Sequence, residues 1–213
     1  MNFVPIRSLF TALTGSLLVA SHLTFAADPA DLLTGTDLTT HWETTGNWSL
    51  SEGVAKLTPR PGESGWSRWS AYLWSKNQLK DFEIEFDYLL QPKGNSGFYL
   101  HVGDRNDPVR KGIEVQIFDS ASFPAEKPLN DHDSGGIIPS IPPTKRAAKP
   151  AGEWNHFRIV VKEGKLTVHL NGELVNEVNL DHPKIKDRPE TGYFGFQDHG
   201  LPLSLRNIRV KPL

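Results

Sequence analysis

The chain has 213 residues, of which 38% are hydrophobic and 23% are charged, with 18 glycines, 16 prolines and no cysteine. This is the composition of an ordinary globular protein, and it excludes a disulfide-stapled mini-protein and any metal site built on thiolates. A net charge of −2, without a block of lysine and arginine, argues against nucleic-acid binding, which needs a concentrated basic surface.

Residues 1–26 predict a secretory signal peptide. Arg7 supplies a positive start, residues 8–23 form an apolar stretch, and Thr24-Phe25-Ala26 offers a small-x-small cleavage site. The apolar stretch is shorter than the roughly 20 residues of a membrane-spanning helix, and a lipobox would require cysteine. We therefore expect a periplasmic or secreted protein with one β-sandwich domain over residues 27–213.

That domain is expected to consist of β-strands. Apolar residues recur with period two, and glycine, asparagine and proline interrupt the runs about every ten residues. Strands are predicted at 48–57, 71–75, 81–89, 96–102, 113–118, 193–197 and 203–211. Residues 154–178 predict a three-stranded meander with turns at Glu163-Gly164 and Asn171-Gly172. So many strands in one domain imply an all-β, two-sheet antiparallel sandwich.

The strand over residues 81–89 predicts one buried and one charged face. Its charged face carries Glu83, Glu85 and Asp87. Paired acids along one strand are typical of retaining β-glucanases. The order here, however, is Glu-x-Glu-x-Asp rather than Glu-x-Asp-x-Glu. A solvated sheet face is the better interpretation, so we do not expect these three residues to be catalytic.

The proline-rich residues 120–152 form the one long irregular segment. Such a segment is typically a functional loop or disordered, and its prolines favour a stiff, ordered loop. Within it, Asp131, His132 and Asp133 could ligate calcium or zinc, but adjacent ligands rarely reach one ion together. A polar loop tip is the preferred interpretation, and neither these residues nor Asp104 and Asp107 form a recognised metal loop. Trp66, Trp69 and Trp74 could stack on sugar rings, but aromatic residues near a strand are more often core, and only Trp66 or Trp69, in a turn rich in glycine and serine, is free to be exposed.

Polar side chains are predicted to share a sheet face in three strand segments. The first segment contributes Asn95, Tyr99 and His101, the second Glu114 and Gln116, and the third Gln197 and His199. If these strands are neighbours, a carboxylate, amides, imidazoles and a phenol converge on one groove that suits a sugar. Taken singly, Glu114 or Gln116 on a solvated sheet face is more often a surface residue, and only the convergence of these side chains favours a site.

The same segments, with residues 149–155 and 206–210, resemble the 3-keto-disaccharide hydrolase family. The matching motifs are Lys93-Gly94-Asn95-Ser96-Gly97-Phe98, Ile113-Glu114-Val115-Gln116-Ile117, Lys149-Pro150-Ala151-Gly152-Glu153-Trp154-Asn155, Leu170-Asn171-Gly172, Gly195-Phe196-Gln197-Asp198-His199-Gly200 and Arg206-Asn207-Ile208-Arg209-Val210. The resemblance implies a jelly-roll sandwich like those of concanavalin A and laminin G domains, and export to the bacterial envelope. Two departures from the family pattern are His101, where arginine is common, and Ile137-Ile138, where an aromatic residue is common.

The resemblance also implies cleavage of glycosides oxidised to a ketone at sugar carbon 3. A base removes the hydrogen on carbon 2, the enolate expels the glycosidic oxygen from carbon 1, and water adds. Glu114 and His199 are the catalytic candidates, either one as base and the other as acid. Asn95, Tyr99, His101, Gln116 and Gln197 are the substrate-binding candidates.

Two other functions stay open at this stage, a non-catalytic carbohydrate-binding module and a structural interaction module of the envelope. No cofactor and no metal site are predicted, although a structural or catalytic divalent metal is left open. Because no nucleotide-binding fingerprint is present, a separate sugar 3-dehydrogenase is expected to make the ketone.

Overall fold

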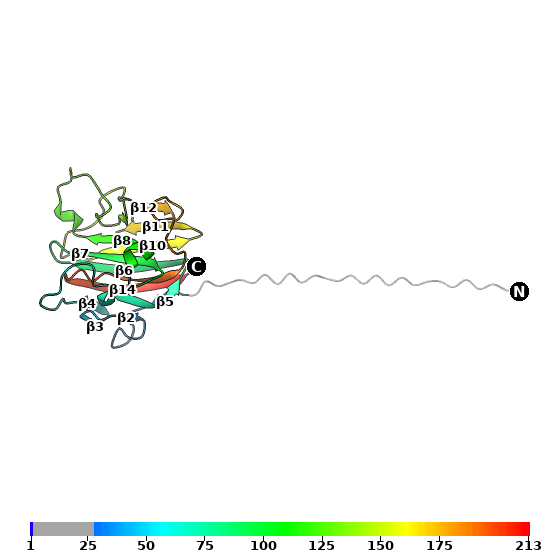
Figure 1. Ribbon diagram of the computed structural model, residues 1–213, viewed down its shortest axis with the longest axis horizontal. Coiled ribbons are helices and arrows are strands. Elements are labelled where there is room, and N and C mark those ends of the chain that lie inside the picture. The colour runs from blue at the N-terminus through cyan, green and yellow to red at the C-terminus, as the bar shows by residue number, and fades with distance from the viewer. Residues whose placement is uncertain (2–27) are drawn as a thin grey trace.

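The computed structural model describes residues 28–213, together with Met1, and it consists of two antiparallel sheets packed face to face (Figure 1). The predicted signal peptide therefore lies outside the described residues, apart from Met1. Between residues 28 and 213, no helix is long and apolar enough to cross a bilayer.

The larger sheet has eight strands. In spatial order they are β12 (Glu173–Asn179), β11 (Lys165–Leu170), β10 (Asn155–Lys162), β6 (Phe82–Leu90), β14 (Leu203–Pro212), β4 (Val54–Leu57) and β3 (Trp48–Ser51), with β1 (Ala30–Asp31) also paired to β14. The last strand of the chain, β14, thus lies between β6 and β4, as Figure 1 shows in red.

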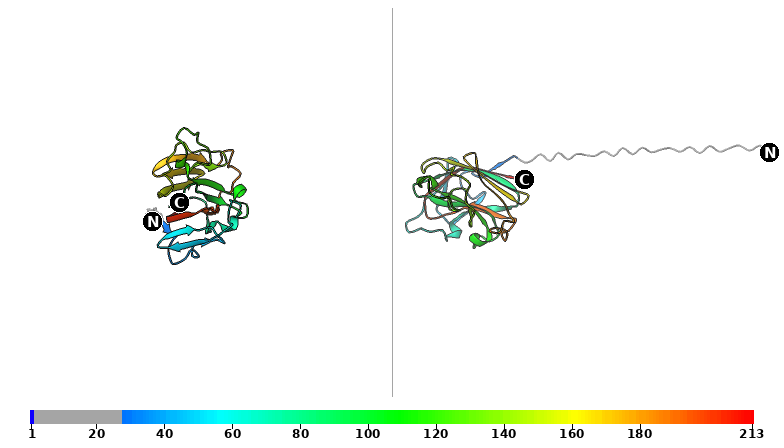
Figure 2. Two further views of the ribbon diagram at one scale, coloured as in Figure 1. Left: turned by 90° about the vertical axis from the view of Figure 1, so that its left-hand side faces the viewer. Right: turned by 90° about the horizontal axis from the view of Figure 1, so that it is seen from above.

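The smaller sheet has six strands. In spatial order they are β2 (Trp42–Glu43), β5 (Leu73–Leu79), β13 (Gly192–Phe196), β7 (Asn95–Val102), β8 (Ile113–Phe118) and β9 (Ile137–Ile138). The remaining elements are the one-turn helix α1 (Pro108–Lys111) and the 3-10 helices η1 (Trp69–Ala71) and η2 (Ser120–Ser122). Figure 2 shows the two layers from two further sides.

Two-residue turns fix the register of the larger sheet. The predicted meander is confirmed as β10, β11 and β12, and both residues of the Asn171-Gly172 turn have positive φ, at 53° and 85°. That backbone conformation matches the twist of the strands that it joins. The prediction of one strand over residues 48–57 is wrong in detail, because Glu52-Gly53 makes a turn of the same kind and divides it into β3 and β4.

Aromatic side chains join the two sheets across the core. Phe86 of the larger sheet lies 5.3 Å from Phe98 and 4.9 Å from Phe196 of the smaller sheet, between ring centroids. All three rings are fully buried, and burial of such a side chain contributes roughly 1.5–3 kcal/mol each. The inner face of the smaller sheet therefore belongs to the apolar core between the two sheets.

Irregular segments cover that outer face and one end of the sandwich. Residues 119–136 leave the end of β8 and return to pair with it, since the N–H of Gly135 donates to the Gln116 carbonyl at 3.0 Å. The Asp133 carboxylate, nearly fully buried, accepts from Arg146 at 3.1 Å. The prediction of an ordered loop in this region is therefore confirmed for residues 130–136.

Candidate active site

The pairing of β7 with β8 places a carboxylate beside a phenol on the outer face of the smaller sheet. Tyr99 is opposite Glu114 in register, and its hydroxyl donates to Glu114 Oε2 at 2.6 Å. The Glu114 side chain lies over Gly97, where an added Cβ would stand only 2.2 Å from Oε1. Glycine at position 97 is therefore what allows the carboxylate to lie flat on the sheet.

A pocket of about 270 Å³ opens above this pair. It is lined by Trp66, Asn95, Tyr99, Val109, Glu114, His132, Ile138, Gln197 and His199. Five of the seven residues predicted as site residues thus meet in one pocket. We call it the reaction pocket.

Glu114 has an unusual environment for a carboxylate. It is 8% exposed, and within residues 28–213 it forms no ion pair. Burial raises its pKa to about 7, although the hydrogen bond from Tyr99 works to lower it. A carboxyl group that titrates near neutral pH is suited to taking and returning a proton.

Amide groups flank the carboxylate. Gln116 is buried, and its Nε2 donates to Asn95 Oδ1 at 2.8 Å. This contact leaves the Asn95 Nδ2 group to donate to a ligand. Gln116 does not line the pocket itself, and it reaches the pocket only through its hydrogen bond to the lining residue Asn95.

Gln197 follows β13 and is tied to the neighbouring strand through its backbone. Its N–H donates to the Gly97 carbonyl at 2.8 Å, and its carbonyl accepts from Ser96 Oγ at 2.8 Å. Its side chain lies near the hydroxyls of Tyr72 and Tyr99. Burial raises the pKa of both phenols, so both stay protonated and can donate.

The structure does not bring His101 into the reaction pocket, so its predicted placement is wrong. Its backbone φ is +51°, and the pairing of β7 with β13 is irregular between Val102 and Tyr99. A bulge of this kind moves the following side chains to the other face of the sheet. His101 Nε2 contacts the Lys80 carbonyl at 2.7 Å, and its ring packs against Phe82.

Sequence reasoning missed His132 as a pocket residue. Its Nδ1 lies 2.9 Å from Asp131 Oδ1, and the other Asp131 oxygen accepts from the N–H of Ser140. Although burial works to raise the pKa of Asp131, the contacts with Ser140 and His132 hold it below its usual value. An ionised Asp131 orients the imidazole and leaves its Nε2 free for a ligand. The sequence shows an acidic residue next to a histidine, but not that the loop folds back over β8.

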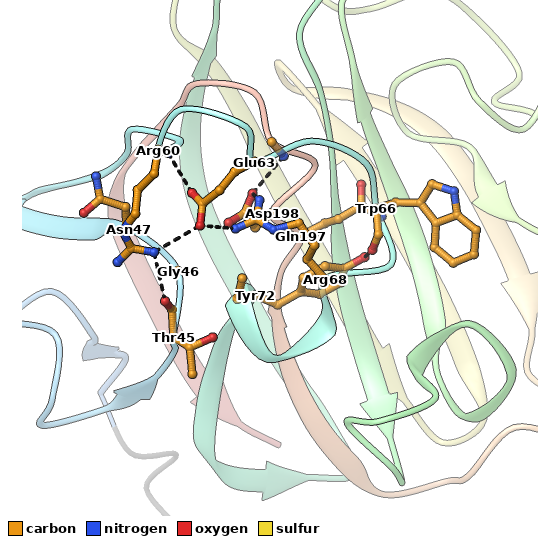
Figure 3. A network of polar contacts seen from close by, with 12 residues as sticks. Thr45, Gly46, Asn47, Arg60, Glu63, Trp66, Arg68, Tyr72, Gln197 and Asp198 are labelled. Carbon is orange, nitrogen blue, oxygen red and sulfur yellow. Dashed lines mark hydrogen bonds and ion pairs between the residues drawn. The ribbon is translucent and has the colours of Figure 1, made fainter.

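On the other side of the pocket, a network of charged side chains joins the loop over residues 60–68 to the loop that carries Asp198 (Figure 3). Arg68 contacts Glu63 at 2.7 Å and Asp198 at 3.1 Å, and Arg60 also contacts Glu63 at 3.0 Å. Asp198 is fully buried, and burial raises its pKa. Because Asp198 lies between Gln197 and His199, the network fixes the loop that carries both.

In the described part of the chain, no group of three histidine, aspartate or glutamate side chains lies close enough together to hold a metal ion. Asp131 and Asp133, considered above as ligands, point to different partners, His132 and Arg146. The pocket brings one carboxyl group and two imidazoles together, and such groups can transfer protons.

Comparisons with known proteins show which family and fold the chain resembles as a whole. A model of the 3-keto-alpha-glucoside-1,2-lyase-like domain matches residues 28–211. The chain is 28% identical over 203 residues to a 3-keto-disaccharide hydrolase of Bacteroides thetaiotaomicron, a match that covers 78% of this chain and 70% of that protein. The resemblance inferred from the motifs is therefore confirmed.

Solved structures share the fold. A candidate glycosyl hydrolase of Parabacteroides distasonis superposes with a TM-score of 0.74 at 23% identity, over 88% of this chain and 100% of that chain. A carbohydrate-binding module of Bacillus subtilis superposes with a TM-score of 0.54 at 14% identity, over 80% of this chain and 95% of that chain. Both matches confirm the predicted jelly-roll sandwich, which serves catalytic and binding proteins alike.

Proposed function

Because the chain belongs to the 3-keto-alpha-glucoside-1,2-lyase-like family, we propose that it cleaves glycosides whose sugar carries a ketone at carbon 3. The observation that supports this most is Glu114, a buried carboxyl group with a pKa of about 7 in a pocket that also holds two imidazoles. A group that only binds a neutral sugar needs no such pKa, whereas a general base does.

The first step is removal of the hydrogen on carbon 2. The neighbouring ketone acidifies this hydrogen, because the electron pair left behind spreads onto the carbon 3 oxygen as an enolate. Glu114, when ionised, takes the proton. Asn95 Nδ2 and the Gln197 side chain line the same pocket and are the proposed donors to the enolate oxygen.

The second step breaks the bond between carbon 1 and the glycosidic oxygen. The enolate electron pair forms a double bond between carbons 1 and 2, and the leaving oxygen takes a proton from an imidazole. Water then adds, with its hydroxyl to carbon 1 and a proton to carbon 2, so the overall reaction is hydrolysis. His199 is the proposed acid, and His132, held by Asp131, is the competing candidate.

Two residues act through others in this scheme. Tyr99 donates to Glu114 and Gln116 donates to Asn95, so they position the base and the enolate donor. Glu114 and His199, the two catalytic candidates from the sequence, are proposed here as the base and the acid. His101 has no role at this site.

We further propose that the protein works outside the cytoplasm and receives its substrate from a separate sugar 3-dehydrogenase. The positive start at Arg7 and the apolar stretch before residue 26 support export. Sequencing the N-terminus of the protein recovered from a bacterial periplasm tests this, and an N-terminus at residue 27 is the expected result.

The decisive assay compares an aryl 3-keto-glucoside with its unoxidised parent. We expect release of the aryl alcohol from the ketone alone, and exchange of the carbon 2 hydrogen for deuterium in heavy water. The assay is run with and without a chelator, and equal rates are expected. Binding of both compounds without cleavage would instead identify a lectin-like module.

The two imidazoles can be distinguished by the leaving group. A nitrophenolate leaves without help, whereas a methoxide needs a proton. Replacing the acid with alanine should therefore slow the methyl glycoside far more than the nitrophenyl glycoside. We expect this selective loss in His199→Ala, and finding it only in His132→Ala would reassign the acid.

A further inference from the structure

A second cavity, of about 790 Å³, lies at the end of the sandwich where strands of both sheets begin or end. It is surrounded by the β5–β6 turn, the ends of β7 and β12, the start of β8, the β10–β11 turn and residues 180–190. It shares no lining residue with the reaction pocket, and no step of the proposed reaction uses it. We call it the end cavity.

His101, which the bulge in β7 turns away from the reaction pocket, lines the end cavity and is only 1% exposed. Its Nε2 lies 2.7 Å from the Lys80 carbonyl, which can only accept, so Nε2 carries the hydrogen. Burial lowers the pKa of His101, so the ring is neutral and Nδ1 carries a lone pair. Nδ1 is buried and has no hydrogen-bond partner within residues 28–213. A buried acceptor of this kind favours a ligand that donates an N–H or O–H to it.

Carboxylates are spread around the mouth of the end cavity. Asp81, Glu163 and Asp181 lie on three different turns, and within the described residues none of them forms an ion pair. Glu190 is the fourth, and it pairs with Lys80 at 2.8 Å. Asp81 and Glu190 lie close enough to His101 to work against burial and raise its pKa. The imidazole acceptor therefore stands among negative charges.

The cations of the cavity do not neutralise these acids. Lys80 is taken by Glu190, and Arg188 donates to the Arg110 carbonyl on a neighbouring loop. Lys186 is exposed, and a lysine on a flexible stem can turn its ammonium group into water. Four carboxylates thus face three cations, and the unpaired groups are mainly acceptors.

The spread of the carboxylates indicates the shape of the ligand. In the described part of the chain no three acidic or histidine side chains lie close enough to hold one metal ion, so a small ion cannot meet them together. The wall between them is apolar, with Leu180, Ile185 and Pro189. Among the described residues that line the cavity there is no Trp, Tyr or Phe on which a sugar ring could stack. A linear polyamine fits better, because its ammonium groups only donate and its methylene groups can lie on the apolar wall.

Residues 180–190 are held in place over the cavity. The N–H of Leu180 donates to the Gly164 carbonyl at 2.7 Å, and the N–H of Arg188 donates to the Ile185 carbonyl at 2.9 Å. The Ile185 side chain is buried in the core. Pro189 packs on Gly103, where an added Cβ would stand 2.8 Å from the proline Cγ. A site that is formed in advance loses little entropy when a ligand binds.

We infer that the end cavity is a binding site for a linear polyamine. One ammonium group donates to His101 Nδ1 and pairs with Asp81, while the others pair with Glu163 and Asp181 at the mouth. The site does not depend on the proposed function, because its test measures binding and involves no turnover.

Calorimetry of the full protein with spermidine tests the site, at about pH 8 and about 0.15 M salt so that diffuse attraction is screened. We expect spermidine to bind, putrescine, which has one ammonium group fewer, to bind severalfold more weakly, and the uncharged four-carbon diol not to bind. His101→Gln keeps a donor for the Lys80 carbonyl but removes the Nδ1 acceptor, so it should raise the Kd for spermidine about tenfold. Glu163→Gln should raise it about threefold. Glu153→Gln, an exposed acid at the other end of β10, is the matched control and should leave the Kd unchanged.

Three results would overturn the inference. The first is no binding of spermidine, and the second is an equal effect of Glu163→Gln and Glu153→Gln, which would show attraction to the acidic surface in general. The third is binding of inorganic phosphate that Lys186→Gln abolishes, which would identify an anion site. Circular dichroism checks the folding of His101→Gln. If that variant does not fold, Asp81→Asn takes its place, and an unchanged Kd in both Asp81→Asn and Glu163→Gln would also overturn the inference.

Discussion

Acidic side chains stand on the outer faces of both sheets, but their partners differ. Those on the larger sheet pair with cationic side chains, whereas the one on the smaller sheet does not. On the larger sheet, Glu83 accepts from Arg158 at 2.7 and 3.0 Å, and Asp87 contacts His156 at 2.8 Å and Arg206 at 3.0 Å. On the smaller sheet, Glu114 has a phenol as its partner and loops above it.

The pKa values follow from these surroundings. Burial works to raise the pKa of Asp87, but hydrogen bonds from His156, Arg206 and Asn207 hold it below its usual value. Glu114 lacks such cations, so burial dominates and raises its pKa to about 7. A carboxylate that pairs with a cation on a neighbouring strand forms a surface ion pair, whereas a carboxylate that is buried beside a ligand pocket is a candidate for chemistry.

The largest expected difference between the two faces is in turnover. Glu114→Gln removes the base but keeps the shape and a hydrogen-bond acceptor for Tyr99, so we expect kcat/KM on a 3-keto-glycoside to fall by about 10³-fold or more. Glu85→Gln is the matched control, the same substitution on the other sheet, and should retain wild-type kcat/KM. Steady-state kinetics of both variants, with circular dichroism to confirm folding, make the comparison. Similar kinetics in both variants would remove Glu114 from the mechanism.

The second expected difference is in how stability depends on pH. The folded-state pKa of Glu114 lies above its ordinary 4.5, so the folded state binds this proton more tightly than the unfolded state does. Stability from this group is therefore fully present below about pH 4.5 and declines as the pH rises to about 7, by up to about 3 kcal/mol. Urea unfolding at pH 5 and pH 8 should show that Glu114→Gln gains stability over the wild type at the higher pH. Glu85→Gln should show no such gain, and an equal gain in both would contradict the assigned pKa.

The third expected effect is a shift in the pH dependence of kcat/KM. The hydrogen bond from Tyr99 lowers the pKa of Glu114, so Tyr99→Phe should raise that pKa further. Because the base works when ionised, the acidic limb of log kcat/KM should move to higher pH, by on the order of one unit. Tyr88→Phe, which removes a buried phenol that faces Ser134 instead, is the control. An acidic limb that stays in place would mean that another group controls it.

The alternation of apolar and polar residues along the strands is enough to predict the sandwich and much of the pocket. It placed Glu114 and Tyr99 on one face, and the separate segment carrying Gln197 and His199 joined them, as the pairing of β13 with β7 confirms. It failed at His101, because one residue with positive φ breaks the period of two. No pattern of apolar residues reports a bulge of that kind.

The pocket walls were harder to predict than its floor. His132 and Ile138 reach the pocket because their loop returns to β8, and that return depends on buried contacts such as the one between Asp133 and Arg146. Such contacts join residues that are distant in sequence and follow no local period. The exposed Trp66 was expected from its glycine-rich turn, although the network that holds it was not.

The smallest expected effect concerns the charged face of the larger sheet. Glu85 lies 3.7 Å from Arg158, and both side chains are more than one-third exposed, so Glu85→Gln should change the free energy of unfolding by no more than about 0.5 kcal/mol. Glu83 holds the same arginine through two short hydrogen bonds, so Glu83→Gln should cost more, up to about 1 kcal/mol. Urea unfolding in low and high salt measures both, and high salt should reduce both losses because these pairs are exposed. A larger loss that persists in high salt would show that this face, like the one around Glu114, is shielded from water.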